Sequence, residues 1–229
     1  MTNRLALCLL VPVMLVMVSL NLHAEPDMSL RTEIESLIYM HSIDGIDYNR
    51  AKALGTEAIP YLVEKLNDPE KKEFWVNIIV SLGCIEDPGA LPGLIEFLES
   101  AHGEVDIYTF RALLSVPFAI GCISSSGDRQ AYTYLAEWID TPQSQIVNWS
   151  FHNKNIHDLL SQQAIMGLAV SGLPEARKKL ADLRNQPASK SFSPAVLQAR
   201  INTLNTASSI MSRMEQTGRA SIFNPQVNR

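Results

Sequence analysis

Apolar residues recur every three or four positions along most of this chain, and no stretch alternates apolar and polar residues with a period of two. Four short segments share one spelling, because each places an alanine four residues before a leucine. At about 100° per residue, the apolar positions of each segment fall on one side of a helix. The pattern therefore predicts four amphipathic helices on a common core: EAIPYLVEKL at 57–66, GALPGLIEFL at 89–98, QAYTYLAEWI at 130–139 and EARKKLADLR at 175–184.

A second apolar stripe precedes these repeated segments. It is clearest in DPEKKEFWVNIIVSLG at 68–83, where Asp68 can cap a helix and Gly83 can end it. Similar stripes occur at 110–118 and 159–168. The chain therefore reads as a repeated helix–turn–helix unit, and the missing period-two alternation argues against a sheet.

The remaining segments are more polar. Those at 141–155 and 185–193 read as connections between helices. Pro194 then opens a last helix that is expected to reach about Arg213, and its polar character suits a cap on the end of a helical stack. Residues 217–229 are expected to fray as a flexible tail.

Two segments, LGCIEDPGALPGLIEFL at 82–98 and AIMGLAVSGLPEARKKLADL at 164–183, resemble HEAT repeats. The resemblance is specifically to the short bacterial HEAT-like repeats that are also called phycobilisome-lyase-like repeats, and it covers about residues 30–186. The resemblance implies an all-α fold, a right-handed α-solenoid of about four helical hairpins with a C-terminal capping helix. An ordinary helical bundle is the alternative. Such repeats specify architecture rather than function.

Catalytic motifs are missing from the sequence. Related repeats occur in bilin lyases and in iron hydroxylases, and the hydroxylases bind metal through adjacent His-Glu pairs. This sequence contains no such pair, and it lacks G-x-S-x-G, H-E-x-x-H, phosphate-loop and Ser-x-x-Lys motifs. We therefore expect a non-catalytic protein with no cofactor and no metal ion, and an enzyme or chaperone-like modifier is an alternative.

The N-terminus has the layout of a signal peptide, because Arg4 precedes an apolar run at 5–20 and the small residue Ala24 follows. We expect residues 1–24 to be cleaved and the mature chain, with one domain at 25–216, to be periplasmic or secreted. A retained membrane anchor is the alternative, although the apolar run is short for a bilayer.

Charge is distributed unevenly along the chain. Beyond residue 24 there are 18 basic and 24 acidic residues, an acidic balance that gives no reason to expect nucleic acid. Residues 25–174 hold 9 basic and 21 acidic groups, whereas residues 175–229 hold 9 basic and 3 acidic. This asymmetry favours charge-steered contacts between copies or with a partner. A further alternative is an envelope component whose basic C-terminal segment touches anionic lipid or polymer peripherally, through Arg177, Lys178, Lys179, Arg184, Lys190 and Arg200.

The candidate binding site is the side of the four repeated helices that lies opposite their apolar centre. Six residues after each alanine stands an acid, and three residues after it stand two tyrosines, a glycine and a lysine. In HEAT-like stacks this side forms the concave surface, so the resemblance implies a groove that receives a cationic or extended segment of a protein or peptide partner. A merely solvated helix face is the alternative. The predicted binding residues are Tyr61, Glu64, Glu96, Tyr134, Glu137, Lys179 and Asp182, with Trp149 in the connection at 141–155 as a further aromatic contact.

Two cysteines remain after residue 24, and both follow glycine, in LGCI for Cys84 and in IGCI for Cys122. In an oxidising compartment they could form a disulfide between neighbouring repeats. Equivalent points on packed helices are about 8–10 Å apart, whereas a disulfide needs Cα atoms within about 7 Å. Two buried thiols are therefore the other alternative.

Overall fold

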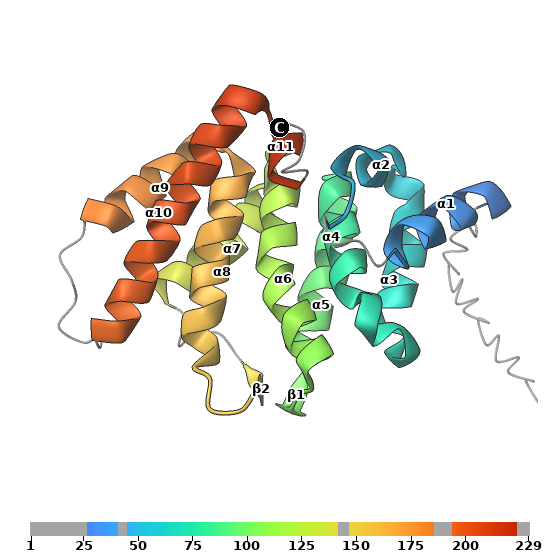
Figure 1. The fold of residues 1–229 in the computed structure, drawn as a ribbon, viewed down its shortest axis with the longest axis horizontal. Helices are drawn as coiled ribbons and strands as arrows, with labels where there is room; N and C mark the ends of the chain where they lie inside the picture. Colours follow the sequence, from blue (N-terminus) through green and yellow to red (C-terminus); the bar gives the residue numbers. More distant parts are fainter. Residues whose placement is uncertain (1–26, 41–44, 142–146, 186–193, 224–229) are drawn as a thin grey trace, which may run out of the picture.

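The computed structural model describes residues 27–40, 45–141, 147–185 and 194–223 of the chain (Figure 1). Within these ranges the chain is mostly helical, and its few strand residues form one two-stranded sheet. The predicted all-α class is therefore confirmed at this coarse level. The predicted signal peptide at 1–24 lies outside the described residues.

The first part of the chain folds into short helices, three of which are entered through a turn of 3-10 helix. They are α1 (Met28–Ile38), α2 (Tyr48–Ala53), α3 (Ile59–Leu66), α4 (Trp75–Ile85) and α5 (Leu91–Ser100), and the 3-10 turns at Thr56–Ala58, Pro69–Phe74 and Pro88–Ala90 lead into α3, α4 and α5. The second part contains α6 (Ile107–Ser124), α7 (Arg129–Asp140), α8 (Ile156–Ser171), α9 (Pro174–Asn185), α10 (Pro194–Thr217) and α11 (Ala220–Phe223). Helices α3, α5, α7 and α9 coincide with the four repeated segments.

Aspartate side chains start many of these helices. In each case the carboxylate accepts a hydrogen bond from a backbone N–H of the first turn, which would otherwise have no partner inside the helix. Such a cap stabilises a helix by about 1 kcal/mol. Part of the acidic excess therefore has a structural use, at Asp27, Asp47, Asp68, Asp87, Asp106 and Asp128.

The helices form two rows. In the first row α4 packs against α6, α6 against α8 and α8 against α10, and these helices follow one another across the molecule in Figure 1. In the second row α3, α5 and α7 pack against α4, α6 and α8, and α9 also packs against α8. The repeated segments therefore supply the second row, and the segments before them supply the first.

Glycine allows the first-row helices to approach each other closely. A Cβ atom built on Gly83 of α4 would lie 2.7 Å from the Cα atom of Ala119 in α6. One built on Gly121 of α6 would overlap the backbone of Gly167 in α8. The glycines in LGCI and IGCI thus mark helix crossings where only a hydrogen atom fits between the backbones.

Helix α6 lies at the centre of the core. It packs between α4 and α8, and residues such as Leu113, Ile120 and Ile123 are fully buried. Among the described residues it is the one helix whose length and composition would allow it to cross a membrane, and 56% of it is buried inside the protein.

The predicted end of α4 was wrong. The helix continues past Gly83 to Ile85 and ends at Glu86, which has a left-handed backbone with φ 58. Gly83 is used for packing against α6, so it does not serve as the stop. A left-handed residue other than glycine is strained, which makes Glu86 unusual.

The structure also contains a small two-stranded sheet, which the sequence pattern argued against. Strand β1 (His102–Glu104) pairs in parallel with β2 (Asn148–Ser150), which lies in the segment predicted as a polar connection. Strands of three residues are too short to show alternation. The pairing joins the loop before α6 to the loop before α8.

The C-terminal segment is more ordered than the sequence suggests. Helix α10 runs beyond Arg213 to Thr217, and the expected tail contains α11, in which Ser221 and Phe223 are buried. The prediction of a flexible tail is therefore wrong for residues 217–223. Residues 224–229 lie outside the described part of the chain.

Candidate binding face

The four acids predicted for the binding site are all exposed to solvent. We call the surface that they mark on α3, α5, α7 and α9 the acidic face, defined by Glu64, Glu96, Glu137 and Asp182. Glu64 forms an ion pair with its neighbour Lys65 at 3.0 Å. The side chains of the other three make no salt bridge to any residue that the structure describes. Three carboxylates are therefore free of internal partners in the described structure.

Contacts between successive second-row helices show that these helices are neighbours. A Cβ atom on Gly93 of α5 would lie 2.8 Å from the side chain of Val63 in α3. Tyr134 of α7 donates a hydrogen bond to Glu99 of α5 at 3.4 Å. Lys179 of α9 forms an ion pair with Asp140 of α7 at 2.6 Å. The acidic face therefore extends over adjacent helices.

Two shallow hollows lie beside the acidic face, and the described residues that line them belong to α7 in the first and to α7 and α9 in the second. The first has a volume of about 440 Å³ and is lined by Arg129, Gln130, Thr133, Tyr134 and Glu137. The second has a volume of about 320 Å³ and is lined by Tyr132, Asp140, Glu175, Lys178, Lys179, Asp182 and Leu183. The structure thus brings Tyr134 together with Glu137, and Lys179 together with Asp182.

Tyr61 was expected on the exposed side, but only 5% of its surface is exposed. Its hydroxyl donates a hydrogen bond of 2.6 Å to Glu35 in α1. Burial, with this hydrogen bond second, raises the pKa of Tyr61 to about 12. The residue therefore fixes α1 on α3 and is not part of a binding surface. Its partner comes from a preceding helix, which helix periodicity within α3 cannot reveal.

Tyr134 is half-buried in the wall of the first hollow. Burial is the main cause that raises its pKa to about 12, and the charge of Glu99 acts in the same direction. The hydroxyl therefore stays protonated at neutral pH and can donate a hydrogen bond. Tyr134 is the aromatic residue of the predicted set that remains beside the acidic face.

Trp149 does not belong to this face. It is 5% exposed and lies in β2, where its ring packs edge-on against Phe110 at 6.4 Å between centroids. Phe110 also stacks on Phe151 at 4.0 Å. Because the pairing of β2 with β1 holds Trp149 against α6, its role is in the core, and the predicted aromatic contact is corrected.

Cys84 and Cys122 are both buried free thiols. The disulfide considered from the sequence is therefore not formed. Burial raises the pKa of Cys122 to about 12 and that of Cys84 well above its ordinary value. Since the thiolate is the reactive form, neither sulfur is a nucleophile at neutral pH in this arrangement.

Several basic side chains of the C-terminal segment are used inside the molecule. Arg177 pairs with Glu215, and Arg184 donates hydrogen bonds to the backbone of Leu204 and to Ser208. Lys179 pairs with Asp140. Arg200 is partly buried, Lys178 is exposed, and Lys190 lies outside the described residues. The segment therefore offers fewer unpaired cations to an anionic surface than its composition suggests.

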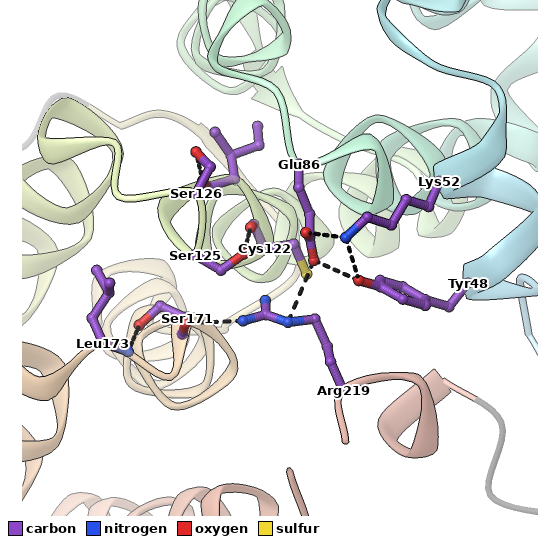
Figure 2. A network of polar contacts seen from close by, with 10 residues as sticks. Tyr48, Lys52, Glu86, Cys122, Ser125, Ser126, Ser171, Leu173 and Arg219 are labelled. Atoms are coloured by element: carbon purple, nitrogen blue, oxygen red, sulfur yellow. Dashed lines mark hydrogen bonds and ion pairs between the residues drawn. The ribbon is translucent and has the colours of Figure 1, made fainter. Parts of the chain in front are cut away.

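A polar cluster that the sequence did not reveal lies where the first row meets the C-terminus (Figure 2). Glu86 accepts hydrogen bonds from the Tyr48 hydroxyl at 2.7 Å and from Lys52 Nζ at 2.6 Å. Arg219 Nε lies 3.3 Å from the same carboxylate. The side chain of Glu86 is only 14% exposed. We call Tyr48, Lys52, Glu86 and Arg219 the junction cluster.

Within the described residues, no group of three or more His, Cys, Asp or Glu side chains could hold a metal ion. Comparisons with protein-family models, with curated proteins and with solved structures give no match to this chain. The assignment of a function therefore depends on the geometry of the surface.

Proposed function

We propose that this protein is an exported, non-catalytic α-solenoid of HEAT-like hairpins that binds a protein or peptide partner through its acidic face. The two rows of helices support the solenoid, since each second-row helix packs on the first row and α10 follows α8 as a cap would. The acidic face would then be the concave surface, as the resemblance to HEAT repeats implies.

The observation that carries the proposal is the row of exposed carboxylates on adjacent helices. Glu96, Glu137 and Asp182 have no ionic partner among the described residues, so a ligand could neutralise them without breaking an internal ion pair. A lysine- or arginine-rich segment that follows the row would be attracted by all of them.

The two hollows could give a partner a surface shape to recognise, in addition to the negative charge of the acidic face. Tyr134 offers an amphipathic ring and a hydroxyl in the first hollow, next to Glu137. Lys179 and Asp182 present opposite charges in the second hollow. An extended peptide could place side chains in both hollows while its cationic groups face the carboxylates, which favours a peptide over a small molecule.

The test is a charge reversal with a matched control. Binding of a short lysine-rich peptide is followed by fluorescence anisotropy at low and high salt. We expect Glu96→Lys with Glu137→Lys to weaken binding by about tenfold at low salt. Glu70→Lys with Glu73→Lys changes the net charge equally, in the exposed turn before α4, and should have little effect. If both double variants weakened peptide binding equally, the acidic face would be only a solvated surface and not a binding site.

A pull-down then searches for the natural partner. Wild-type protein and the Glu96→Lys, Glu137→Lys variant are used as baits in extracts of the periplasm and culture medium. A protein retained by the wild type and by the control variant, but lost from the face variant, would identify the partner.

Export is tested separately by expressing the chain with its own N-terminus in a bacterium. We expect protein from the periplasm or medium to have the intact mass of a chain that begins after Ala24. Recovery of the full-length chain in the membrane pellet would show instead that the N-terminal segment is retained as a membrane anchor.

A further inference from the structure

We propose that the five residues Arg219–Phe223 form a latch, which opens separately from the rest of the fold and keeps Cys84 and Cys122 away from solvent while it is closed. The latch consists of Arg219 and the short helix α11. The proposal does not depend on the acidic face or its partner.

The latch connects distant parts of the chain. The ring of Phe223 stacks on Tyr48 of α2 with 5.0 Å between centroids, and meets Phe118 of α6 edge-on at 5.6 Å. Figure 1 shows α11 beside the upper end of α6, on the side towards α2. In a simple stack of repeats each unit touches only its neighbours. The latch therefore adds a contact that such a stack would lack.

Arg219 is the polar centre of the latch. Its Nε lies 3.3 Å from Glu86 at the end of α4, and its Nη2 donates a 3.0 Å hydrogen bond to the carbonyl oxygen of Ser171, the last residue of α8. A cation is favourable at the C-terminal ends of helices because their free carbonyl groups carry partial negative charge. One side chain thus joins the ends of two first-row helices.

Cys122 lies in the neighbourhood of this arginine (Figure 2). Burial raises the pKa of both thiols, and the positive charge of Arg219 opposes this effect at Cys122 and at the neighbouring Cys84. In Figure 2 the sulfur of Cys122 is drawn next to the carboxylate of Glu86, above Arg219 in this view. Moving Arg219 away would therefore uncover the side of Cys122 that faces the C-terminus.

Several features make the latch easier to open than the helices below it. Gly218, with φ 80, ends α10 and turns the chain into a helix of only four residues. Arg219 Nη1 is buried without a hydrogen-bond partner among the described residues. This unsatisfied donor reduces the stability of the closed position.

The experiment measures how fast Ellman's reagent labels the two thiols in the folded full-length chain, with Cys8→Ser in every variant so that Cys8 gives no signal. We expect Arg219→Gln and Phe223→Ala to increase the rate by about tenfold or more, since the first removes charged contacts and the second removes two ring contacts. Lys72→Gln, which removes an exposed ion pair with Asp106 at the start of α6, is the control and should label like the wild type.

Urea distinguishes latch opening from unfolding. If the latch opens alone, the labelling rate of the wild type should depend weakly on low urea concentrations, because little surface is exposed. A rate that follows urea as steeply as global unfolding, or variants that label faster only in proportion to their loss of global stability, would overturn the proposal. Because the urea dependence of the labelling rate is measured on the wild type, this test remains valid even if a variant fails to fold.

The order of labelling gives a second test. In a Cys84→Ala background the remaining Cys122 should still respond to Arg219→Gln, because the arginine is its neighbour (Figure 2). In a Cys122→Ala background the response of Cys84 should be smaller. Equal responses of the two thiols would show that Arg219 does not cover Cys122 in solution.

Discussion

Gly121 of α6 faces Gly167 of α8 so closely that a Cβ atom on Gly121 would overlap the carbonyl group of Gly167. Both residues are buried within helices that form the centre of the first row. This crossing sets the distance between α6 and α8. Because neither backbone can move without disturbing its other neighbours, the contact is a sensitive test of the two-row packing.

Gly121→Ala should destabilise the protein. Alanine favours a helix over glycine by about 1 kcal/mol, but overpacking at a backbone contact costs about 1–3 kcal/mol or more, so we expect a net loss near 2 kcal/mol. Urea unfolding measures the change. Arg111→Ala on the exposed side of α6 serves as the control and should stay within about 0.5 kcal/mol of the wild type. A Gly121→Ala protein as stable as the wild type would contradict the packing described for this crossing.

Asp106 should make the free energy of unfolding depend on pH in the acid range. It caps α6 by accepting a hydrogen bond from Thr109 N–H at 2.9 Å, and it forms a 2.6 Å ion pair with Lys72. The lysine first, and then the cap, lower the pKa of Asp106 to about 2. Because the folded pKa is depressed, this stability is present above the unfolded pKa of about 3.9 and is lost as pH falls towards 2.

Asp106→Ala should therefore cost about 1 kcal/mol at neutral pH, as expected for a lost cap, and progressively less in acid. Urea unfolding of both proteins at a series of pH values measures the difference. Asp182→Ala, which removes an exposed aspartate that caps no helix, is the matched control. A difference between wild type and Asp106→Ala that stayed constant down to about pH 2 would argue against the assigned role.

Tyr61→Phe should loosen the attachment of α1. It removes the hydroxyl that donates to Glu35, which costs about 1.5 kcal/mol or more because the acceptor is charged. The raised pKa also predicts that wild-type stability falls as pH rises from about 10 towards 12, since the folded protein retains the tyrosine proton that the unfolded chain loses. The variant should lose that part of the alkaline slope. Tyr108→Phe, at an exposed tyrosine, should leave the stability unchanged at neutral pH.

Trp149→Ala separates a core role from a binding role. The buried ring fills space against Phe110, so we expect a loss of about 3–5 kcal/mol in unfolding free energy. Binding of the lysine-rich peptide should persist under conditions where the variant is still folded. If the variant had normal stability but bound the peptide more weakly, Trp149 would have to be assigned to the binding surface.

The sequence by itself determined the helices and which side of each second-row helix faces solvent. The period of apolar residues places Leu62, Leu94, Leu135 and Leu180 in the core, and the same period turns Glu64, Glu96, Glu137 and Asp182 outwards. These properties depend on residues only a few positions apart, so a local pattern contains them.

Only the tertiary structure decided which side chains meet. Tyr61 is buried because Glu35 of α1 lies opposite it, and Trp149 is buried because β2 pairs with β1. Glu86 meets Arg219 because α10 turns the end of the chain back across the first row. Each contact joins segments that are distant in sequence, where a small change in helix crossing alters the partner, so no local period could have encoded it.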